Sequence, residues 1–431
     1  MMTPAWSLML ALAQAAQGEP SLLQYEVNGL RIVHQVTPPA TDIVAVRLYL
    51  LGGARQVPAE LAGVEPFLLM ASAYGTEAYR GEEARRALAK TGSSIDISAG
   101  ADWTSYSFGG LKQEFDSTWS VFADRLMHPT LDSAAIEVVR QRLLGRVARR
   151  HASPEDYAWF LSDSLAFDGH PYAVDPDGSE RSLRALTADQ LRRYASEQFV
   201  TSRMVLVVVG DMSHDRVQHA VERTLGTLPR GSYQWSLPEA PSRPKTNIVA
   251  AYRSTPTNHI VGTVIGPPRS SKDYPAFERG MYFLDDWISY LVREQEGLSY
   301  AAGVDVNDRG VPSAAVYVST ARPDSAIKLV NLVLTQVVSN VTIPRSRLRE
   351  AAKAYNLGYI RSTETAAGHA SMLARALLYE GDPTAAAHRA DVMGNLTFAD
   401  LRGSIREYFK NIQYAFVGDT LWLPREQMNK R

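Results

Sequence analysis

The sequence of 431 residues contains no cysteine, which excludes thiol catalysis, disulfide frameworks and zinc sites built on cysteine. It also lacks an excess of charge of either sign, because 45 Lys and Arg residues stand against 46 Asp and Glu residues. Without a basic surplus the chain has little attraction for a phosphate backbone, so we expect no nucleic-acid partner. Any metal site would have to use histidine and carboxylate ligands.

Long hydrophobic runs are also missing, with one partial exception at the N-terminus. Residues 5–13 are apolar, but this run is too short to span a bilayer, and we expect no stable membrane span. Small residues follow the run, so residues 1–18 resemble a signal peptide, although no Lys or Arg precedes the apolar part. Two interpretations stay open: a cleaved signal that places the protein outside the cytoplasm, or a helical arm that packs on the body or on a partner.

The signatures of the common enzyme classes are absent. We find no P-loop, no dinucleotide-binding glycine fingerprint, no nucleophile-elbow serine and no H-E-x-x-H helix. No two histidines stand four residues apart, as zinc ligands on one helical face would, so we interpret them as surface or capping residues. The nine histidines are His34, His128, His151, His170, His214, His219, His259, His369 and His388.

What the sequence does contain is a repeat of itself. In the first half, a helix capped by Thr187 precedes an apolar strand at 204–209, and Gly210-Asp211 follows it. In the second half, a helix capped by Thr397 precedes an apolar strand at 414–417, and Gly418-Asp419 follows it. A repeat of this length indicates duplication of a whole domain rather than a solenoid.

The repeat and a proline-rich stretch predict the domain organisation. We expect an N-terminal domain at 19–231, a linker at 232–245 and a C-terminal domain at 246–431. Runs of strands separated by runs of helices indicate an α+β fold, in which each domain is a mostly antiparallel sheet covered by helices on one face. The predicted strand regions are 28–34, 43–50, 94–108, 248–265 and 303–320, and the main predicted helices are 81–90, 133–150, 277–293, 324–339 and 344–362.

A motif in the first half carries a family resemblance. A Gly52-Gly53 turn precedes a helical stretch, and Gly75-Thr76 follows it. This order resembles the pitrilysin and insulinase family of zinc metallopeptidases, the inverzincins, in which the helix carries the motif H-x-x-E-H. At the two histidine positions of that motif this chain has Pro66 and Met70, and at the catalytic glutamate position it has Leu69. The zinc motif is therefore degenerate.

The third zinc ligand of the family is missing as well. In the family it is a glutamate on the long helix before a Pro-Glu-Asp turn, which corresponds here to Pro154–Asp156. Counting back from that turn places the ligand at Gly145 or Arg146, and neither residue binds zinc. The resemblance therefore implies that this chain holds no metal and no other cofactor.

The second half keeps a pattern that the family uses, from Arg293 to Tyr300 in the order R-E-x-x-G-L-x-Y. A helix that ends near Arg293 and reverses at Gly297 brings both side chains to one surface. A guanidinium and a phenol suit a peptide carbonyl whose oxygen becomes negative, and the resemblance implies that this pair acts on the zinc site of a partner. The alternative is an arginine that favours a helix C-terminus and a tyrosine that packs at a strand edge.

The resemblance extends to the non-catalytic subunits of bacterial heterodimers and to the mitochondrial processing peptidase subunits. It implies a non-catalytic subunit of a zinc metalloendopeptidase whose homologous partner holds the zinc and whose substrate is an unfolded peptide or small protein. A structural core subunit and a peptide-binding module remain as alternatives. The segment Ser94–Ser98 corresponds to the strand whose edge pairs with substrate in the family, whereas Asp285 and Asp286 have no assigned role. The expected location is the periplasm if the signal is real, and the cytoplasm otherwise.

Overall fold

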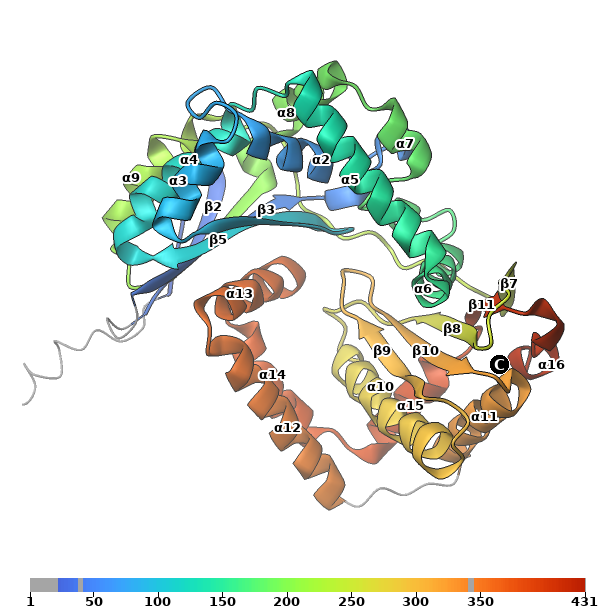
Figure 1. Cartoon of the computed structure of the whole chain (residues 1–431). Coiled ribbons are helices and arrows are strands. Elements are labelled where there is room, and N and C mark those ends of the chain that lie inside the picture. Colours follow the sequence, from blue (N-terminus) through green and yellow to red (C-terminus); the bar gives the residue numbers. More distant parts are fainter. Residues whose placement is uncertain (1–21, 38–41, 340–344, 431) are drawn as a thin grey trace, which may run out of the picture.

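The computed structural model describes residues 22–37, 42–339 and 345–430. These residues form two α+β domains, one in each half of the chain, and each domain is built on one β-sheet (Figure 1). The predicted fold class of two tandem α+β domains is confirmed. The apolar run in residues 1–18 lies outside the described residues, and no helix within the described part has the length and hydropathy needed to cross a membrane.

The first sheet has six strands in the spatial order β1-β2-β6-β3-β5-β4. Its strands are β1 (Leu22–Val27), β2 (Leu30–Val36), β3 (Ile43–Leu51), β4 (Ser94–Ala99), β5 (Trp103–Leu111) and β6 (Met204–Gly210). Neighbouring strands are antiparallel, except for the parallel pair β2 and β6. Strand β4 pairs only with β5 and therefore forms one edge of the sheet.

The second sheet has five strands in the order β7-β11-β8-β10-β9. Its strands are β7 (Asn247–Tyr252), β8 (Asn258–Ile265), β9 (Ala301–Asn307), β10 (Ser313–Thr320) and β11 (Gln413–Gly418). Here β7 and β11 form the one parallel pair. When β1 is set aside, β2-β6-β3-β5-β4 of the first sheet corresponds strand by strand to this order. The shared order and the shared parallel pair are what a domain duplication produces.

Two equivalent helices begin at the capping residues that the repeat predicted. Helix α8 (Ala188–Gln198) is capped by Thr187, and α15 (Phe398–Tyr408) is capped by Thr397. In both, the threonine hydroxyl accepts from the backbone N–H three residues later, and the side chain at that later position accepts from the cap backbone. Each helix therefore starts with a capping box, which satisfies N–H groups that have no partner inside the helix.

Helices pack on one face of each sheet. In the first domain they form a core with the sheet and are α2 (Val64–Ala71), α3 (Glu83–Thr91), α4 (Phe115–Met127), α5 (Ser133–Ala152), α7 (Glu180–Ala185), α8 and α9 (His214–Glu222). In the second domain the corresponding layer is α10 (Tyr274–Ile288), α11 (Pro323–Ser339), α15 and the short α16 (Arg425–Met428). Three further helices of the second half are α12 (Arg345–Thr363), α13 (Ala366–Glu380) and α14 (Ala385–Asn395).

The opposite face of each sheet is covered by a helix from the other half (Figure 1). Helix α13 packs its Ala370, Leu373 and Ala374 on β3 and β6, whereas α6 (Pro154–Ala166) packs Ala158 on β8 and β11. Each sheet therefore has helices on both faces. This explains why β6 and β11 are buried along their whole length, and why β6 is an uninterrupted apolar run. The expectation that helices cover each sheet on one face is therefore incomplete.

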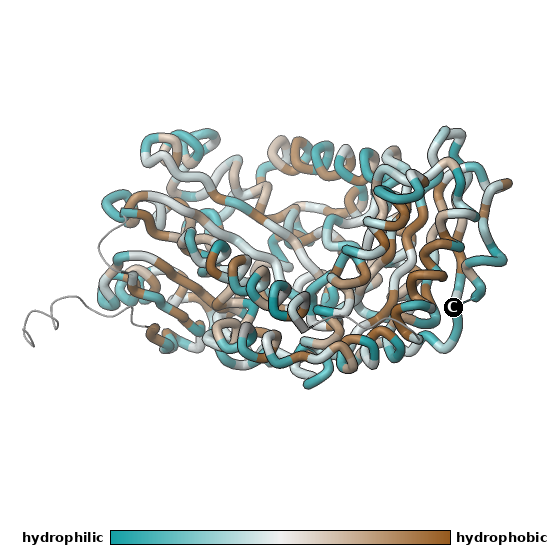
Figure 2. The backbone as a smooth tube through the Cα atoms, turned by 90° about the horizontal axis from the view of Figure 1, so that it is seen from below, coloured by the Kyte–Doolittle hydropathy of each residue, from teal (hydrophilic) through white to brown (hydrophobic). Residues whose placement is uncertain are grey.

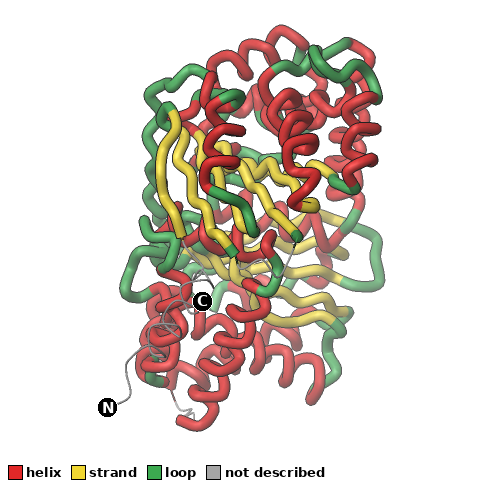
Figure 3. Tube along the Cα trace, turned by 90° about the vertical axis from the view of Figure 1, so that its left-hand side faces the viewer, coloured by secondary structure: helices red, strands yellow, loops and turns green. Residues whose placement is uncertain are grey.

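Hydropathy follows these layers. In Figure 2 the hydrophobic colour concentrates along strands and on parts of the helices, and Figure 3 shows the strands of the two sheets with helices around them. Residues 232–245, predicted as a linker, contain neither helix nor strand. This segment is nevertheless held in place, because Trp235 lies against Trp103 with ring centroids 6.3 Å apart and donates from Nε1 to the Leu378 carbonyl at 2.8 Å.

Candidate functional site

The Gly52-Gly53 turn follows β3 and packs against the loop before β5. Gly53 has φ of +48°, and a Cβ atom there would lie 2.4 Å from the carbonyl oxygen of Gly100. Only glycine fits this close approach between the turn and the loop before β5. Helix α2 follows this turn and packs on the first sheet through Phe67 and Leu68.

Helix α2 places the three degenerate motif positions in two environments. Pro66 and Met70 line a cleft of about 620 Å³ between α2, α3, α5 and the edge strand β4. Leu69 is 1% exposed and belongs to the hydrophobic core of the first domain. An apolar side chain thus stands where the family has its catalytic glutamate, and it stabilises the domain by burial.

A buried ion pair anchors α2 and was not predicted from the sequence. Glu65, the neighbour of Pro66, lies 2.7 Å from the guanidinium of Arg203 and accepts a hydrogen bond of 2.9 Å from the Tyr194 hydroxyl. Arg203 is fully buried, and its Nε also donates to the Leu51 carbonyl at 2.6 Å. Burial and the nearby Glu65 raise the pKa of Tyr194 far above its ordinary value, so its hydroxyl remains a donor.

The third ligand position does not restore a metal site. Gly145 and Arg146 lie on α5, and the Arg146 guanidinium makes an ion pair of 2.7 Å with Asp177. Among the described residues no group of three or more His, Cys, Asp or Glu side chains could hold a metal ion. Proline, leucine, methionine and arginine supply no hard donor for zinc, so the residues present do not fit the metal that the family implies.

The structure brings Arg293 and Tyr300 together. Helix α10 continues as a π-helix over Ser289–Gln295, Gly297 turns the chain with φ of +57°, and β9 starts at Ala301. The Arg293 Cζ lies 5.6 Å from the Tyr300 ring centroid. The Tyr300 side chain is 89% exposed, and neither residue lines the cleft beside Pro66. The pair is therefore open to solvent and lies outside the cleft beside the degenerate motif.

The two acidic residues before this segment, Asp285 and Asp286, lie in different environments. Asp285 accepts a hydrogen bond of 2.8 Å from the Val304 backbone N–H, and burial raises the pKa of its carboxyl. It joins α10 to β9 close behind Tyr300. Asp286 is exposed on the helix. Asp285 thus helps to position the segment that carries Arg293.

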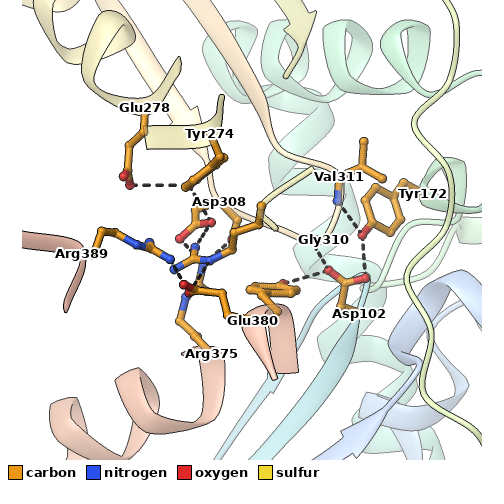
Figure 4. A network of polar contacts seen from close by, with 12 residues as sticks. Asp102, Tyr172, Tyr274, Glu278, Asp308, Gly310, Val311, Arg375, Glu380 and Arg389 are labelled. Carbon is orange, nitrogen blue, oxygen red and sulfur yellow. Dashed lines mark hydrogen bonds and ion pairs between the residues drawn. The ribbon is translucent and has the colours of Figure 1, made fainter. Parts of the chain in front are cut away.

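A polar network lies between the two halves (Figure 4). Asp102, 3% exposed, accepts from the hydroxyls of Tyr172 at 2.6 Å and Tyr379 at 2.9 Å and from the Gly310 backbone N–H at 2.8 Å. Its Oδ1 also lies 3.1 Å from Nε of Arg55. Because Gly310 and Tyr379 belong to the second half, this one carboxylate fastens the domains to each other.

A second carboxylate centre adjoins the first. Asp308 accepts from the Tyr274 hydroxyl at 3.0 Å and pairs with Arg269 and, at 2.7 Å, with Arg375 of α13. Burial alone would raise the pKa of Asp308, but the two guanidiniums lower it to about 2. Beside these groups lies an interdomain cavity of about 750 Å³, lined by residues of both halves that include Trp103 and Arg309.

Comparisons with known proteins agree with this geometry. Residues 31–168 match the insulinase family, peptidase family M16, and residues 185–355 match the M16 inactive domain. The first match covers the degenerate motif and strands β4 and β5, and the second contains the Arg293–Tyr300 segment.

Several curated proteins are similar in sequence. Subunit 1 of the human mitochondrial cytochrome b-c1 complex is 25% identical over 64% of this chain and 58% of its own length. An uncharacterized zinc protease of Mycobacterium leprae is 24% identical over 82% of this chain and 81% of that protein. A probable mitochondrial-processing peptidase subunit beta of Schizosaccharomyces pombe is 24% identical over 57% of this chain and 55% of that protein. The chain thus spans only about half of the length of the two mitochondrial relatives.

Solved structures share the fold over almost the whole chain. A protease from Helicobacter pylori has a TM-score of 0.84 at 17% identity and covers 93% of this chain and 100% of its own. An M16 inactive-domain protein from Pseudomonas fluorescens has a TM-score of 0.83 at 18% identity and covers 93% of this chain and 98% of its own. The chain belongs to peptidase family M16, and its residues 185–355 match the inactive domain of that family.

Proposed function

We propose that this chain is a non-catalytic subunit of a heterodimeric zinc metallopeptidase, in which a homologous partner holds the zinc and the general base. The observation that carries this proposal is the exposed Arg293–Tyr300 pair in a chain whose own motif positions hold Pro66, Leu69 and Met70. Membership of family M16 and the similarity to a processing-peptidase subunit support it.

The environment of the pair favours a role toward another molecule. A tyrosine that is 89% exposed gains little stability from burial, so packing at a strand edge does not account for Tyr300. Arg293 has one ion-pair partner in the described part of the chain, the adjacent Glu294 at 3.6 Å, and both of these side chains are largely exposed. Their donors are therefore available to a peptide carbonyl, which they would hold as its oxygen gains negative charge.

Capture of the tagged chain from its native host tests the proposal. We expect mass spectrometry to identify a co-purifying homologue with an intact H-x-x-E-H motif. The two purified subunits mixed together should cleave unfolded casein, whereas each alone should not. N-terminal sequencing of the captured chain would show whether residues 1–18 are removed, as we expect for a cleaved signal peptide. Stoichiometric zinc and chelator-sensitive cleavage by the chain alone would overturn the proposal.

A structural role is the second candidate, and the similarity to cytochrome b-c1 subunit 1 favours it. A core subunit would hold an assembly together without contributing to a reaction. In that case the captured chain would elute within a large complex that contains no H-x-x-E-H subunit. Substitution of Arg293 or Tyr300 would then leave every measured activity of the complex unchanged.

A further inference from the structure

The cleft beside the degenerate motif is rich in arginine. Pro66 and Met70 line it from α2, and the edge strand β4 lines it from the sheet. Three neighbouring helices add positive charge to the same cleft. The arginines that line it are Arg85 of α3, Arg125 of α4, and Arg142 and Arg146 of α5.

Arg125 is the most informative of these side chains. It is 5% exposed, and its guanidinium donates to the Ser72 hydroxyl and the Leu69 carbonyl at 3.4 Å each, both long contacts. No ion pair within the described ranges includes Arg125, and the adjacent Asp124 is paired with His128. A buried cation without a counter-ion is strongly disfavoured, so this position is suited to an anion supplied by another molecule.

The remaining charges leave the cleft positive. Arg146 is paired with Asp177 and Arg85 with Glu82, whereas the Arg142 side chain has no ion pair or hydrogen bond within the described residues. Asp96 of β4 also borders the cleft. Its neighbours Ile95 and Ile97 pack on the core, so alternation along the strand directs the Asp96 side chain to the other face of the sheet. Arg125 and Arg142 thus lack an internal carboxylate.

Strand β4 indicates that the molecule which supplies the anion is an extended peptide. Its six residues pair with β5 on one side only, and the other edge borders the cleft. An unpaired strand edge offers its backbone N–H and C=O groups to an extended peptide. An extended peptide with an acidic side chain could pair with this strand edge and also supply the negative counter-charge that Arg125 does not have within the chain.

We propose that this cleft binds an extended peptide segment and that a carboxylate side chain of that segment is held by Arg125, with Arg142 at the rim. The site that holds zinc in the family is, in this chain, a site for an acidic residue. The proposal concerns this chain by itself, so its success or failure is independent of the heterodimer and of the Arg293–Tyr300 pair.

Titration of the full chain with labelled peptides tests the proposal. Three fluorescein-labelled peptides of alternating valine and threonine would differ only at one central residue, which is Glu, Gln or Lys. By fluorescence anisotropy we expect the Glu peptide to bind about tenfold more tightly than the Gln peptide, a ratio equal to about 1.4 kcal/mol. The Lys peptide should bind most weakly, and the preference for Glu should fall as salt is added.

Matched variants then locate the preference. Arg142→Gln, which removes an exposed charge, should reduce the Glu-over-Gln ratio several-fold, whereas Arg193→Gln on α8, also exposed, should preserve it. Arg125→Lys keeps the charge and should keep most of the preference, and Arg125→Gln should abolish it in protein shown by circular dichroism to be folded. The proposal is overturned if Glu and Gln peptides bind equally, if Arg142→Gln and Arg125→Gln both leave the ratio unchanged, or if free N-acetylglutamate binds as tightly as the Glu peptide.

Discussion

The hydroxyl of Tyr379 donates a hydrogen bond of 2.9 Å to Oδ2 of Asp102, and this bond joins α13 of the second half to the loop before β5 of the first. Tyr379 is buried, and its pKa is raised well above the ordinary value by burial and by Asp102. The Tyr379 hydroxyl therefore stays protonated and donates to Asp102. Helix α13 is therefore held on the first sheet by a hydrogen bond as well as by apolar packing.

Removal of the Asp102 carboxylate should loosen the two halves. Asp102→Ala leaves Arg55 and the two tyrosine hydroxyls without their shared acceptor, which we expect to cost about 3 kcal/mol in the free energy of unfolding. Tyr379→Phe removes one bond to a charged group and should cost about 1.5–3 kcal/mol. Urea unfolding measures both effects, and Asp286→Ala, at an exposed carboxylate, serves as the control. Equal stability of Asp102→Ala and the wild type would show that the network does not fasten the domains.

The ion pair of Glu65 and Arg203 should be the main anchor of α2. Glu65→Gln leaves the buried Arg203 charge uncompensated and should destabilise the chain by about 3–5 kcal/mol in urea unfolding. Glu60→Gln, an exposed change five residues earlier, should alter stability by less than about 0.5 kcal/mol. The double variant Glu65→Leu with Arg203→Met removes both charges and should lose less stability than Glu65→Gln alone. A larger loss in the double variant would contradict this account of the pair.

His34 should make stability fall in acid. Its ring is fully buried on β2 with neither nitrogen hydrogen-bonded among the described residues, and burial, together with His214, lowers its pKa from 6.5 to about 4. The unfolded chain therefore binds a proton more readily than the folded chain, and stability is lost as the pH falls from 6.5 toward 4. One pKa unit corresponds to about 1.4 kcal/mol, so the loss from this residue approaches about 3 kcal/mol.

The variant His34→Leu tests this pH dependence. Between about pH 7.5 and about pH 4.5, its free energy of unfolding should fall by about 2.5 kcal/mol less than that of the wild type. His388→Leu, at an exposed histidine of α14, should retain the full decrease. If His34→Leu and His388→Leu follow the same pH profile as the wild type, the acid sensitivity arises elsewhere.

Much of the fold could be predicted because its signals are local. The caps Thr187 and Thr397 and the strands that end at Gly210 and Gly418 follow from short stretches of sequence, and their repetition identifies the two domains. The degenerate positions and the Arg293–Tyr300 spacing could also be read locally. The structure then places that pair together, as the turn at Gly297 predicted.

The rest depends on contacts between distant parts of the chain. Nothing near Glu65 in the sequence indicates Arg203, and nothing near Asp102 indicates Tyr379. His34 was interpreted as a surface or capping residue, but it is buried because its strand lies inside the sheet. The arginine cleft was missed for the same reason, since Arg125 and Arg142 meet only when α4 and α5 pack beside α2. Only the uninterrupted apolar sequence of β6 indicated, from local sequence, that helices cover both faces of the first sheet.

Substitution of the exposed pair should leave the fold intact. Tyr300 is 89% exposed and Arg293 is about half exposed, so Tyr300→Phe and Arg293→Ala should each change the free energy of unfolding by less than about 0.5 kcal/mol. Thermal unfolding of the purified variants checks this, and gel filtration with the captured partner checks that each variant still assembles. A defect in cleavage can then be assigned to the reaction rather than to folding or to the interface.

In the assembled heterodimer, loss of either donor should slow turnover. Tyr300→Phe removes one hydroxyl with little change in shape, and if that hydroxyl stabilises the developing oxyanion, kcat should fall on the order of a hundredfold with KM nearly unchanged. A group that only holds the substrate would instead raise KM and leave kcat nearly constant. Tyr290→Phe, at an exposed tyrosine of the π-helical segment that carries Arg293, should have no effect on either constant. If Tyr300→Phe and Arg293→Ala both retain wild-type kcat and KM, the pair has no part in the reaction, and the core-subunit account becomes the better one.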